Sequence, residues 1–479
     1  MRRRLVAAVS VFSCIAAAAP GAASAARGPV AVVPGAFRLD QGEMAGDRLV
    51  FSDAGMTEFP SVWVAGPDTR HHLVFEDRQA LKKSSPSFVA SARIVAAATL
   101  PPDRHGARLF AGPVDGPLEQ VGTCDVSLQN EDGSVSTFVA SGRRFAYRDR
   151  GCGSTDPPGV VVRDGIDGRE VARFPVPADQ TVDYLSMAGR YVAYRVATPA
   201  GDRIVEDDAR TGKEVLRVRA PGARVCAGYI RHGLAQPVFC GLDVQSDGKV
   251  AEVQGKLNDY QDLCSGTASW LSPAEPRRHV ITHDACGETG VSLARDRILL
   301  GADVGPISVF RLDGKRYDVY AGTPLEPGVW GFDGKQVFVS RFACLGPAVF
   351  SWRVGRDAPT GVRRSLRCPM RFHDAIVRLG DHPRVELDLT CPHGCPGPIA
   401  VGTADYIDAG TKMFFVRRGT WRLVLPLDED ADLVRRAKKA DRVTLWINHS
   451  FSYWERWRPV IDQTEYVSDT TRIAATVMR

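Results

Sequence analysis

The stretch Gly142-Arg143-Arg144-Phe145-Ala146-Tyr147 returns in altered form as Gly189-Arg190-Tyr191-Val192-Ala193-Tyr194. Each copy has a small residue, one or two polar residues and a short apolar run. Earlier copies are Gly46-Asp47-Arg48-Leu49-Val50-Phe51 and Ala92-Arg93-Ile94-Val95, so the four starts lie 46, 50 and 47 residues apart. Weaker copies follow near Gly233, at Asp296-Arg297-Ile298-Leu299-Leu300 and at Gly334-Lys335-Gln336-Val337-Phe338-Val339. The repeat predicts about seven units of roughly 40 to 50 residues.

A second hairpin follows most of these starts after 14 to 18 residues. In one copy, residues 160–164 lead through Asp167-Gly168 to residues 171–174, and in another, residues 203–207 lead through Thr211-Gly212 to residues 215–218. Asp-Gly tolerates the positive φ that tight hairpins need. We therefore predict comparable turns at Asp115-Gly116, Asp247-Gly248 and Asp313-Gly314.

Units of four strands cannot each bury a hydrophobic face alone, and radial stacking is the usual solution. We predict an all-β protein with a six- or seven-bladed β-propeller over residues 30–366. An array of β-sandwiches is the alternative, but its spacing explains the paired-strand repeat less well.

Strand pairs such as the one from Gly189 to Val218 resemble those of TolB-like and WD40-like propellers of exported bacterial proteins. The resemblance covers roughly residues 30–366 and implies a propeller fold. The chain departs from the WD40 pattern because no Gly-His and Trp-Asp pair recurs.

The composition changes after Cys368-Pro369. Short alternating strands, such as Val385-Glu386-Leu387-Asp388-Leu389, predict a small β-sandwich over residues 371–479. This segment resembles domains appended to exported actinobacterial proteins, through Cys391 to Gly397, Ala409-Gly410 and Arg435-Arg436. Because those domains are generally non-catalytic, the resemblance implies a spacer or docking role.

The N-terminus has the pattern of a signal peptide. Three arginines precede an apolar run from Leu5 to Ala19, and Ala23-Ser24-Ala25 forms a small-residue cleavage site. We expect cleavage after Ala25, secretion, and no membrane span, since a span needs about 20 apolar residues. Lipidation at Cys14 is the rival interpretation, and Arg2-Arg3 leaves a twin-arginine export route open.

Removal of residues 1–25 takes away three arginines and no acidic residue, so the formal charge falls from +5 to +2. Arginines and acids are mixed along the whole chain, whereas nucleic-acid binding needs a concentrated basic surface. We expect no nucleic-acid partner and a monomer.

Ten cysteines remain after Cys14 is removed, and an even number in an exported chain indicates disulfides. Sequence does not fix their connectivity, but pairing neighbours in chain order keeps each bridge within one local unit. The favoured pairs are Cys124 with Cys152, Cys226 with Cys240, Cys264 with Cys286, Cys344 with Cys368, and Cys391 with Cys395.

Two segments have partial metal-site patterns. Cys391 and Cys395 with His393 and His382 provide only two thiols, so a disulfide-closed turn is favoured over zinc. Asp428-Glu429-Asp430-Ala431-Asp432 begins like an EF-hand loop, but the pattern fails at Leu433 and Lys439. Acids followed by Arg435, Arg436, Lys438 and Lys439 predict a short helix instead. We expect no metal and no cofactor.

No local catalytic motif occurs. Gly290-Val291-Ser292-Leu293-Ala294 lacks the second glycine of a hydrolase elbow, and no phosphate-binding loop appears. His283-Asp284 with Glu288 could supply acid and base, but the neighbouring Cys286 favours a stapled turn. Phe451, Tyr453, Trp454 and Trp457 could stack on sugars, although aromatic residues in strands more often pack in cores. Trp63, Trp330 and Trp352 raise the same question for the channel.

The leading hypothesis is a non-catalytic extracellular binding or scaffold protein that uses a propeller face to bind a protein or polysaccharide. The alternative is a propeller-fold glycoside hydrolase or polysaccharide lyase, whose acids would converge in the channel from different blades. A quinone-dependent dehydrogenase would carry recurring tryptophan-rich blades, which this sequence lacks. No catalytic, cofactor-binding or metal-binding residue is identified.

Overall fold

The computed structural model describes much of the chain. The described residues are 31–32, 41–52, 58–66, 71–82, 84, 86–102, 106–124, 138–149, 157–177, 179–198, 200–220, 224–225, 238–257, 263–283, 285, 290–301, 306–321, 329–343, 346–356, 370–392, 394–403, 406–416, 418–451 and 467–479.

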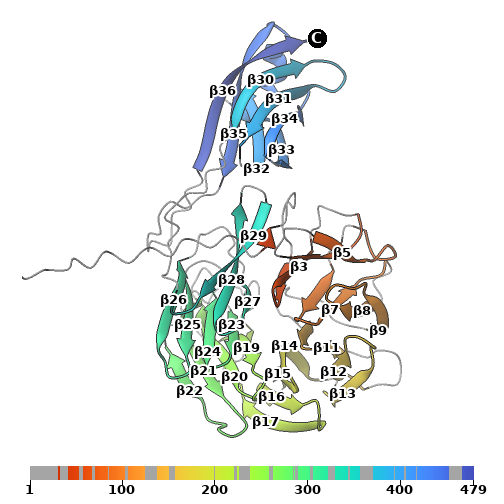
Figure 1. The fold of residues 1–479 in the computed structure, drawn as a ribbon, viewed down its shortest axis with the longest axis vertical. Helices are drawn as coiled ribbons and strands as arrows, with labels where there is room; N and C mark the ends of the chain where they lie inside the picture. The colour runs from red at the N-terminus through yellow and green to blue at the C-terminus, as the bar shows by residue number, and fades with distance from the viewer. Residues whose placement is uncertain are drawn as a thin grey trace, which may run out of the picture.

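The strands before residue 357 form seven blades in a ring, coloured from red through green to teal in Figure 1. Each blade has four antiparallel strands, ordered from the innermost outward. Blades 1 to 3 are β2 (Gln41–Ala45), β3 (Arg48–Ser52), β4 (Ser61–Ala65) and β5 (His71–Glu76); β6 (Ser87–Ala90), β7 (Ile94–Thr99), β8 (Ala107–Pro113) and β9 (Glu119–Cys124); and β10 (Phe138–Ser141), β11 (Arg144–Asp149), β12 (Gly159–Asp164) and β13 (Glu170–Pro175).

Blades 4 to 6 continue the same order. They are β14 (Thr181–Ala188), β15 (Tyr191–Ala197), β16 (Arg203–Asp208) and β17 (Lys213–Arg219); β19 (Val238–Val244), β20 (Val250–Leu257), β21 (Leu263–Leu271) and β22 (His279–Thr282); and β23 (Gly290–Ala294), β24 (Arg297–Gly301), β25 (Pro306–Arg311) and β26 (Arg316–Ala321). A two-residue strand, β18 (Arg224–Val225), pairs in parallel with the free edge of β19.

The seventh blade joins the two ends of the ring. Its strands are β27 (Val329–Phe332), β28 (Gln336–Ala343) and β29 (Gly346–Arg353), and β1 (Ala31–Val32) pairs antiparallel with β29 as the fourth. The predicted propeller is therefore confirmed, and it has seven blades. Closing the sheets into a ring leaves only short, protected edges.

Strands inside the blades are buried on both faces because a neighbouring blade covers each face. All six residues of β7 are buried, and their apolar side chains alternate between two clusters. Ile94, Ala96 and Ala98 pack towards blade 3, and Val95 and Ala97 towards blade 1. This two-sided burial explains why the repeated strands read as short apolar runs.

The ring has two faces with different connections. On one, the turn face, first and second strands are joined by tight turns such as residues 142–143 and 189–190. Gly142 and Gly189 have φ values of 59° and 63° there, which glycine adopts without strain. The other, the loop face, is where the strands joined by connections between blades, and by connections between second and third strands, begin and end.

The predicted turns need two corrections. Asp247-Gly248 lies between the first and second strands of blade 5, not in its second hairpin, and the copy expected near Gly233 falls outside the described residues. Gly168, Gly248 and Gly314 have positive φ as predicted, but Gly116 does not. Asp115-Gly116 belongs to a longer connection between β8 and β9, which does not require the left-handed conformation.

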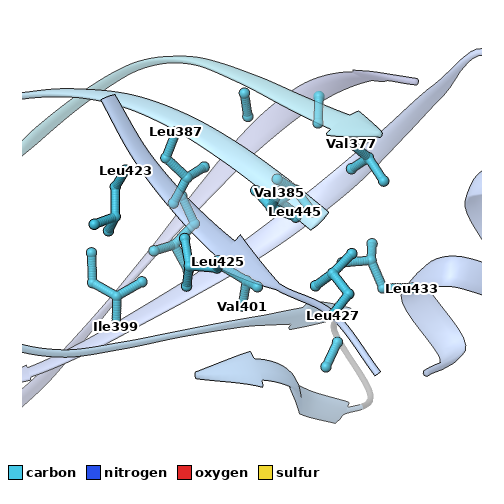
Figure 2. Close-up of a cluster of buried hydrophobic side chains, with 14 of the residues drawn as sticks. Val377, Val385, Leu387, Ile399, Val401, Leu423, Leu425, Leu427, Leu433 and Leu445 are labelled. Carbon is cyan, nitrogen blue, oxygen red and sulfur yellow. The ribbon is translucent and has the colours of Figure 1, made fainter. Parts of the chain in front are cut away.

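The strands after residue 370 form one seven-stranded sheet in the order β33-β32-β35-β36-β30-β31-β34. They are β30 (Arg371–Arg378), β31 (Arg384–Cys391), β32 (Cys395–Thr403), β33 (Tyr406–Val416), β34 (Gly419–Pro426), β35 (Arg442–Phe451) and β36 (Val467–Met478). The sheet curls so that its edge strands β33 and β34 contact each other. It thus encloses a core like that of a β-sandwich, with Leu387, Val401 and Leu445 at 0% exposure (Figure 2).

A short helix packs on this core. It is α1 (Asp432–Ala437), with Asp432 in its first turn and Arg435 and Arg436 in its last. Leu433 and Val434 are buried in the core. The helix predicted in place of an EF-hand loop is confirmed, although Asp428 to Asp430 precede it.

Candidate functional site: the inner strands of the propeller

An active site in a propeller channel would draw its acids from the innermost strands of different blades. The described inner strands carry three acids: Glu43 on β2, Asp183 on β14 and Asp243 on β19. Inner strands of neighbouring blades pack against one another around the ring. These three carboxyls are therefore the candidate catalytic acids of a channel active site.

Glu43 joins blade 1 to blade 2. Its Oε2 accepts a hydrogen bond of 2.6 Å from the backbone N–H of Ala90, the last residue of β6. Burial raises the pKa of Glu43 to about 7, and the bond from Ala90 opposes this rise. The carboxyl is half-buried, and it accepts its hydrogen bond from a backbone amide of the neighbouring inner strand.

Asp243 joins three blades. Its Oδ1 accepts hydrogen bonds from the Ser186 hydroxyl on β14 and from the N–H of Val244, the latter at 2.9 Å. Its Oδ2 accepts a bond of 2.6 Å from the N–H of Leu293 on β23. Burial raises the pKa of Asp243 to about 6, against the lowering effect of these three donors. One side chain thus connects blades 4, 5 and 6.

Asp183 is directed into its own blade. Its Oδ2 lies 2.9 Å from Nη1 of Arg195 on β15, and Nη2 of the same arginine binds Asp202. Arg195 is 1% exposed, so the ion pair is almost completely removed from water. A β-bulge follows at Tyr184, whose φ is 45°. The bulge breaks the alternation of the inner strand and adds local twist.

Similar pairs fix other blades. Asp149 lies 2.7 Å from Nη1 of Arg173 within blade 3. In blade 5, Glu252 at 0% exposure accepts a bond of 2.8 Å from the Ser269 hydroxyl and another from Arg278. These hydrogen bonds and ion pairs offset the cost of burying the carboxyl groups.

All three inner-strand acids form hydrogen bonds or ion pairs within the fold. General acid and base catalysis needs a carboxyl that can exchange a proton with a bound substrate. Glu43, Asp183 and Asp243 instead satisfy backbone amides or an arginine. The arrangement holds blades in register, and that is the chemistry it supports best.

Sequence reasoning missed Glu43 and Asp243. Each lies in an inner strand two or three residues before a turn, and each accepts a hydrogen bond from a backbone amide of the neighbouring blade. An acid within an apolar strand directly before a repeated turn was the available signal.

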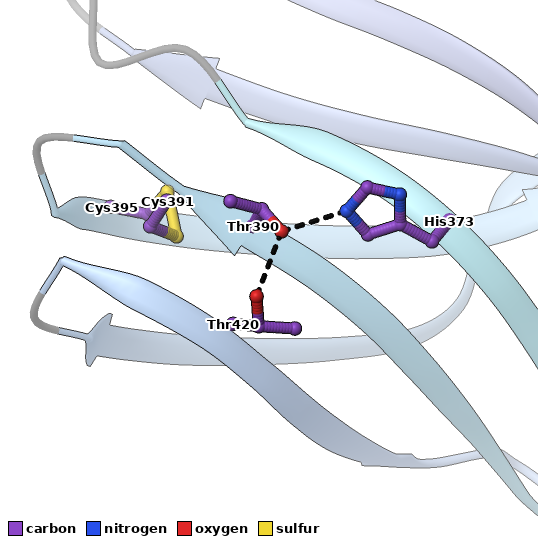
Figure 3. Close-up of a disulfide and its surroundings, with 5 residues drawn as sticks. All are labelled: His373, Thr390, Cys391, Cys395 and Thr420. Carbon is purple, nitrogen blue, oxygen red and sulfur yellow. Dashed lines mark hydrogen bonds between the residues drawn. A yellow bond between two sulfur atoms is a disulfide. The ribbon is translucent and has the colours of Figure 1, made fainter.

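The cysteine prediction is testable at one pair. Cys391 and Cys395 form a disulfide with Cα atoms 5.5 Å apart, as predicted (Figure 3). Beside it, Nε2 of His373 lies 2.7 Å from Oγ1 of Thr390, which lies 3.1 Å from Oγ1 of Thr420. Other cysteine side chains fall outside the described residues: Cys124, Cys152, Cys226, Cys240, Cys264, Cys286, Cys344 and Cys368.

Other candidates are separated by the fold. His283 directly follows β22, with Nδ1 3.3 Å from Oγ1 of Thr267, while Asp284 and Glu288 fall outside the described residues. Trp63 and Trp352 lie on the third strands of their blades and pack on apolar clusters. Trp330 lies on an inner strand, but its side chain is not described, nor are those of Phe451, Tyr453, Trp454 and Trp457.

Two searches of the described residues found nothing. No group of three or more His, Cys, Asp or Glu residues in this part of the chain is arranged to hold a metal ion. No helix there is long and apolar enough to cross a membrane.

Comparisons with known proteins show only distant similarity. No protein-family model matches the chain, and a search of curated proteins found no match. Among solved structures, the computationally designed Ika8 protein has a TM-score of 0.42 and 11% identity over 74% of this chain and 96% of its own.

Two natural propellers are similarly remote. The β-propeller domain of the Trilobed protease from Pyrococcus furiosus has a TM-score of 0.41 and 10% identity, over 67% of this chain and 94% of its own. TolB from Acinetobacter baumannii has a TM-score of 0.33 and 12% identity, over 59% of this chain and 64% of its own. The count of seven blades rests on the strand pairing of this chain.

Proposed function

We propose that this chain is a secreted, non-catalytic binding or scaffold protein whose loop face recognises an extracellular protein or polysaccharide. The observation that carries the proposal is the contrast between the two faces of the ring. Two-residue turns close the first hairpin of several blades on the turn face, whereas long stretches of sequence separate the strands of neighbouring blades that end and begin at the loop face. β9 ends at Cys124 and β10 begins at Phe138, and β17 ends at Arg219 and β19 begins at Val238. Loops on a rigid scaffold are free to vary and commonly carry recognition.

The strand β18 supports this choice of face. It lies within the connection from blade 4 to blade 5 and pairs with Val238 and Phe239, at the start of β19. The paired edge of β19 is the one that faces the channel, because β20 occupies its other edge. β18 therefore lies at the channel edge of blade 5.

Cysteine positions point the same way. Cys124 ends β9 and Cys264 is near the start of β21, where both strands meet the loop face. In the sequence, Cys152 comes after β11 and Cys226 comes directly after β18, and both fall outside the described residues. We propose that Cys124 pairs with Cys152, Cys226 with Cys240, Cys264 with Cys286, and Cys344 with Cys368. Such bridges would fix the loops and reduce the entropy lost on binding.

The test uses the full mature chain, expected to begin at Ala26, in pull-downs with extracellular polysaccharides and envelope proteins. Residues 126–136 are replaced by a Gly-Ser segment of equal length, which keeps Cys124. The control changes the turn face at Thr211-Gly212 to Asn-Gly. We expect the loop replacement to abolish binding and the turn change to preserve it. Equal binding by both variants would contradict the assignment of the loop face.

The enzyme alternative is tested on the same preparations. Chromogenic glycosides and polysaccharides are incubated with the protein, and turnover is compared with a heat-denatured sample. We expect no turnover. Activity that Glu43→Gln removes while the protein stays folded would establish a propeller glycoside hydrolase or lyase and overturn the binding proposal.

A further inference from the structure

Glu206 differs from the other buried acids of the propeller. It lies on β16, the third strand of blade 4, and is 0% exposed. Neither of its carboxyl oxygens has a hydrogen-bond partner within the part of the chain that the structure describes. A carboxylate in this position would lose its hydration without compensation, so the neutral acid is the stable form.

A turn from the neighbouring blade lies against this carboxyl. Residues 245–249 join β19 to β20 in blade 5, and Gly248 has a φ of 83° in this turn. A Cβ atom on Gly248 would lie 3.1 Å from Oε1 of Glu206 and 3.4 Å from Cζ of Tyr191. The absence of a side chain at residue 248 thus lets the turn pack directly on blade 4.

The charged groups nearest Glu206 are mostly acidic. Burial raises its pKa to about 8, and the charges of Asp207, Asp247 and Asp208 add to the rise. Nearby cations have carboxylates of their own: Arg190 Nε lies 3.5 Å from Asp208 Oδ2, and Lys249 binds Asp247.

The opposite side of β16 supplies no partner either. Asp207 accepts a bond of 2.6 Å from the Tyr194 hydroxyl. Arg217 and Glu214, on β17, bind each other. Ionised Glu206 would therefore meet three carboxylates and no uncommitted cation among these groups.

We propose that Glu206 is a proton-dependent latch between blades 4 and 5. In its neutral form the carboxyl lets the turn of residues 245–249 pack on blade 4. When the acid releases its proton to solvent, repulsion and the need for hydration drive the turn away. The device acts on the turn face at one blade interface, and it does not depend on the function proposed for the loop face.

The expected pH dependence follows from proton linkage. When the turn opens, Glu206 reaches water and its pKa returns to an ordinary value of about 4.5. Between that value and about 8, the closed state holds one proton more than the open state. The opening equilibrium therefore rises about tenfold per pH unit in this window and levels off above it.

Hydrogen exchange of the full chain measures this opening directly. The turn contains two reporting amides: Gly248 N–H donates to Gln245 C=O over 2.9 Å, and Gln245 N–H donates to Lys249 C=O over 2.8 Å. After correction for intrinsic exchange, we expect opening of this turn to rise about tenfold per pH unit from pH 6 to 8 in the wild type. Glu206→Gln, which has no proton to lose, should show no such rise.

Glu43→Gln is the matched control, because it makes the same replacement at a carboxyl that has an amide donor. The turn should then keep its wild-type pH dependence. Identical profiles in wild type and Glu206→Gln would overturn the proposal, and so would an equal rise in the C-terminal strands β30 and β31. If Glu206→Gln does not fold, the wild-type profile decides, since a turn whose opening ignores pH has no latch.

Discussion

The inner-strand acids Glu43 and Asp243 of the propeller and two acids of the C-terminal sheet occupy opposite environments. Burial between blades raises the pKa of Glu43 to about 7 and that of Asp243 to about 6. On the outer face of the C-terminal sheet, hydrogen bonds from arginines lower the pKa of two carboxyls. Arg378 acts on Glu386 and Arg422 on Asp388. The same residue types therefore connect blades in one region and form solvated pairs in the other.

This difference gives the two regions opposite responses to pH. A carboxyl with a raised folded pKa stabilises the fold most at low pH, and stability declines as pH rises from the unfolded value towards the folded one. For the propeller this window runs from about pH 4 to about pH 8. A lowered folded pKa stabilises above the unfolded value, and this contribution disappears in acid.

The largest expected effect is that of Asp243→Ala. The change removes the acceptor for Leu293 N–H and for the Ser186 hydroxyl, so blades 4, 5 and 6 lose their shared contact. We expect a loss of about 3 kcal/mol in the free energy of unfolding, measured by urea denaturation, with an unchanged m-value. The comparison mutant Asp388→Ala removes an exposed carboxylate and should shift the midpoint far less. Equal shifts of the urea midpoint in the two variants would show that the contacts of Asp243 between blades add no more stability than an exposed ion pair does.

The disulfide is expected to matter next. In the chain-entropy model, a bridge that closes as short a loop as Cys391 to Cys395 stabilises by about 2 kcal/mol. The double variant Cys391→Ala, Cys395→Ala should lower the protection of β31 and β34 in hydrogen exchange and leave the propeller unchanged. A loss of hydrogen-exchange protection in the propeller blades would mean that removal of the bridge also destabilises the propeller, so that the C-terminal sheet and the propeller are not independent in stability.

Glu43→Gln should have a smaller effect whose sign depends on pH. The amide oxygen can still accept from Ala90 N–H, and no charge is buried. At pH 8 we expect the variant to be more stable than the wild type by about 1 kcal/mol, a value reduced for solvent screening because Glu43 is half-buried. At pH 5 the two should agree closely. Urea midpoints at both pH values test this, and a difference independent of pH would refute it.

The smallest effect is expected for Glu386→Gln. The wild-type carboxylate gains from Arg378 and Arg384 at neutral pH, and this gain disappears as pH falls through the lowered pKa. The variant should therefore be slightly less stable at pH 7 and equal to the wild type near pH 3. A deficit that persists at pH 3 would point to lost packing rather than lost charge.

The repeat in the sequence predicted the propeller because the first hairpin of several blades has a tight turn that can be recognised from its own residues. Gly46, Gly142 and Gly189 all occupy such turns with positive φ. Blade 5 was misplaced because its first turn has five residues, 245–249, and a long connection precedes it. A difference in turn length changes the spacing between repeat copies in the sequence, even where the pattern of apolar strands is the same.

The partners of the inner-strand acids could not be predicted because they are set by the closure of the ring. Asp243 binds the N–H of Leu293, and nothing in the local sequence identifies a backbone amide 50 residues away. The short helix and the Cys391–Cys395 bridge were predictable because their determinants lie within a few residues. Contacts within a hairpin can be inferred from sequence, whereas contacts between blades require the closed ring.

The most direct test is hydrogen exchange of the full chain at pH 5 and pH 8, corrected for intrinsic rates and compared between regions. The account predicts that protection of the inner strands β2, β6, β19 and β23 is lower at pH 8, because Glu43 and Asp243 lose their protons. Protection of β30, β31 and β34 should be the same at both pH values, because hydrogen bonds from arginines lower the pKa of Glu386 and of Asp388. An equal change in both regions, or greater protection of the inner strands at pH 8, would contradict it.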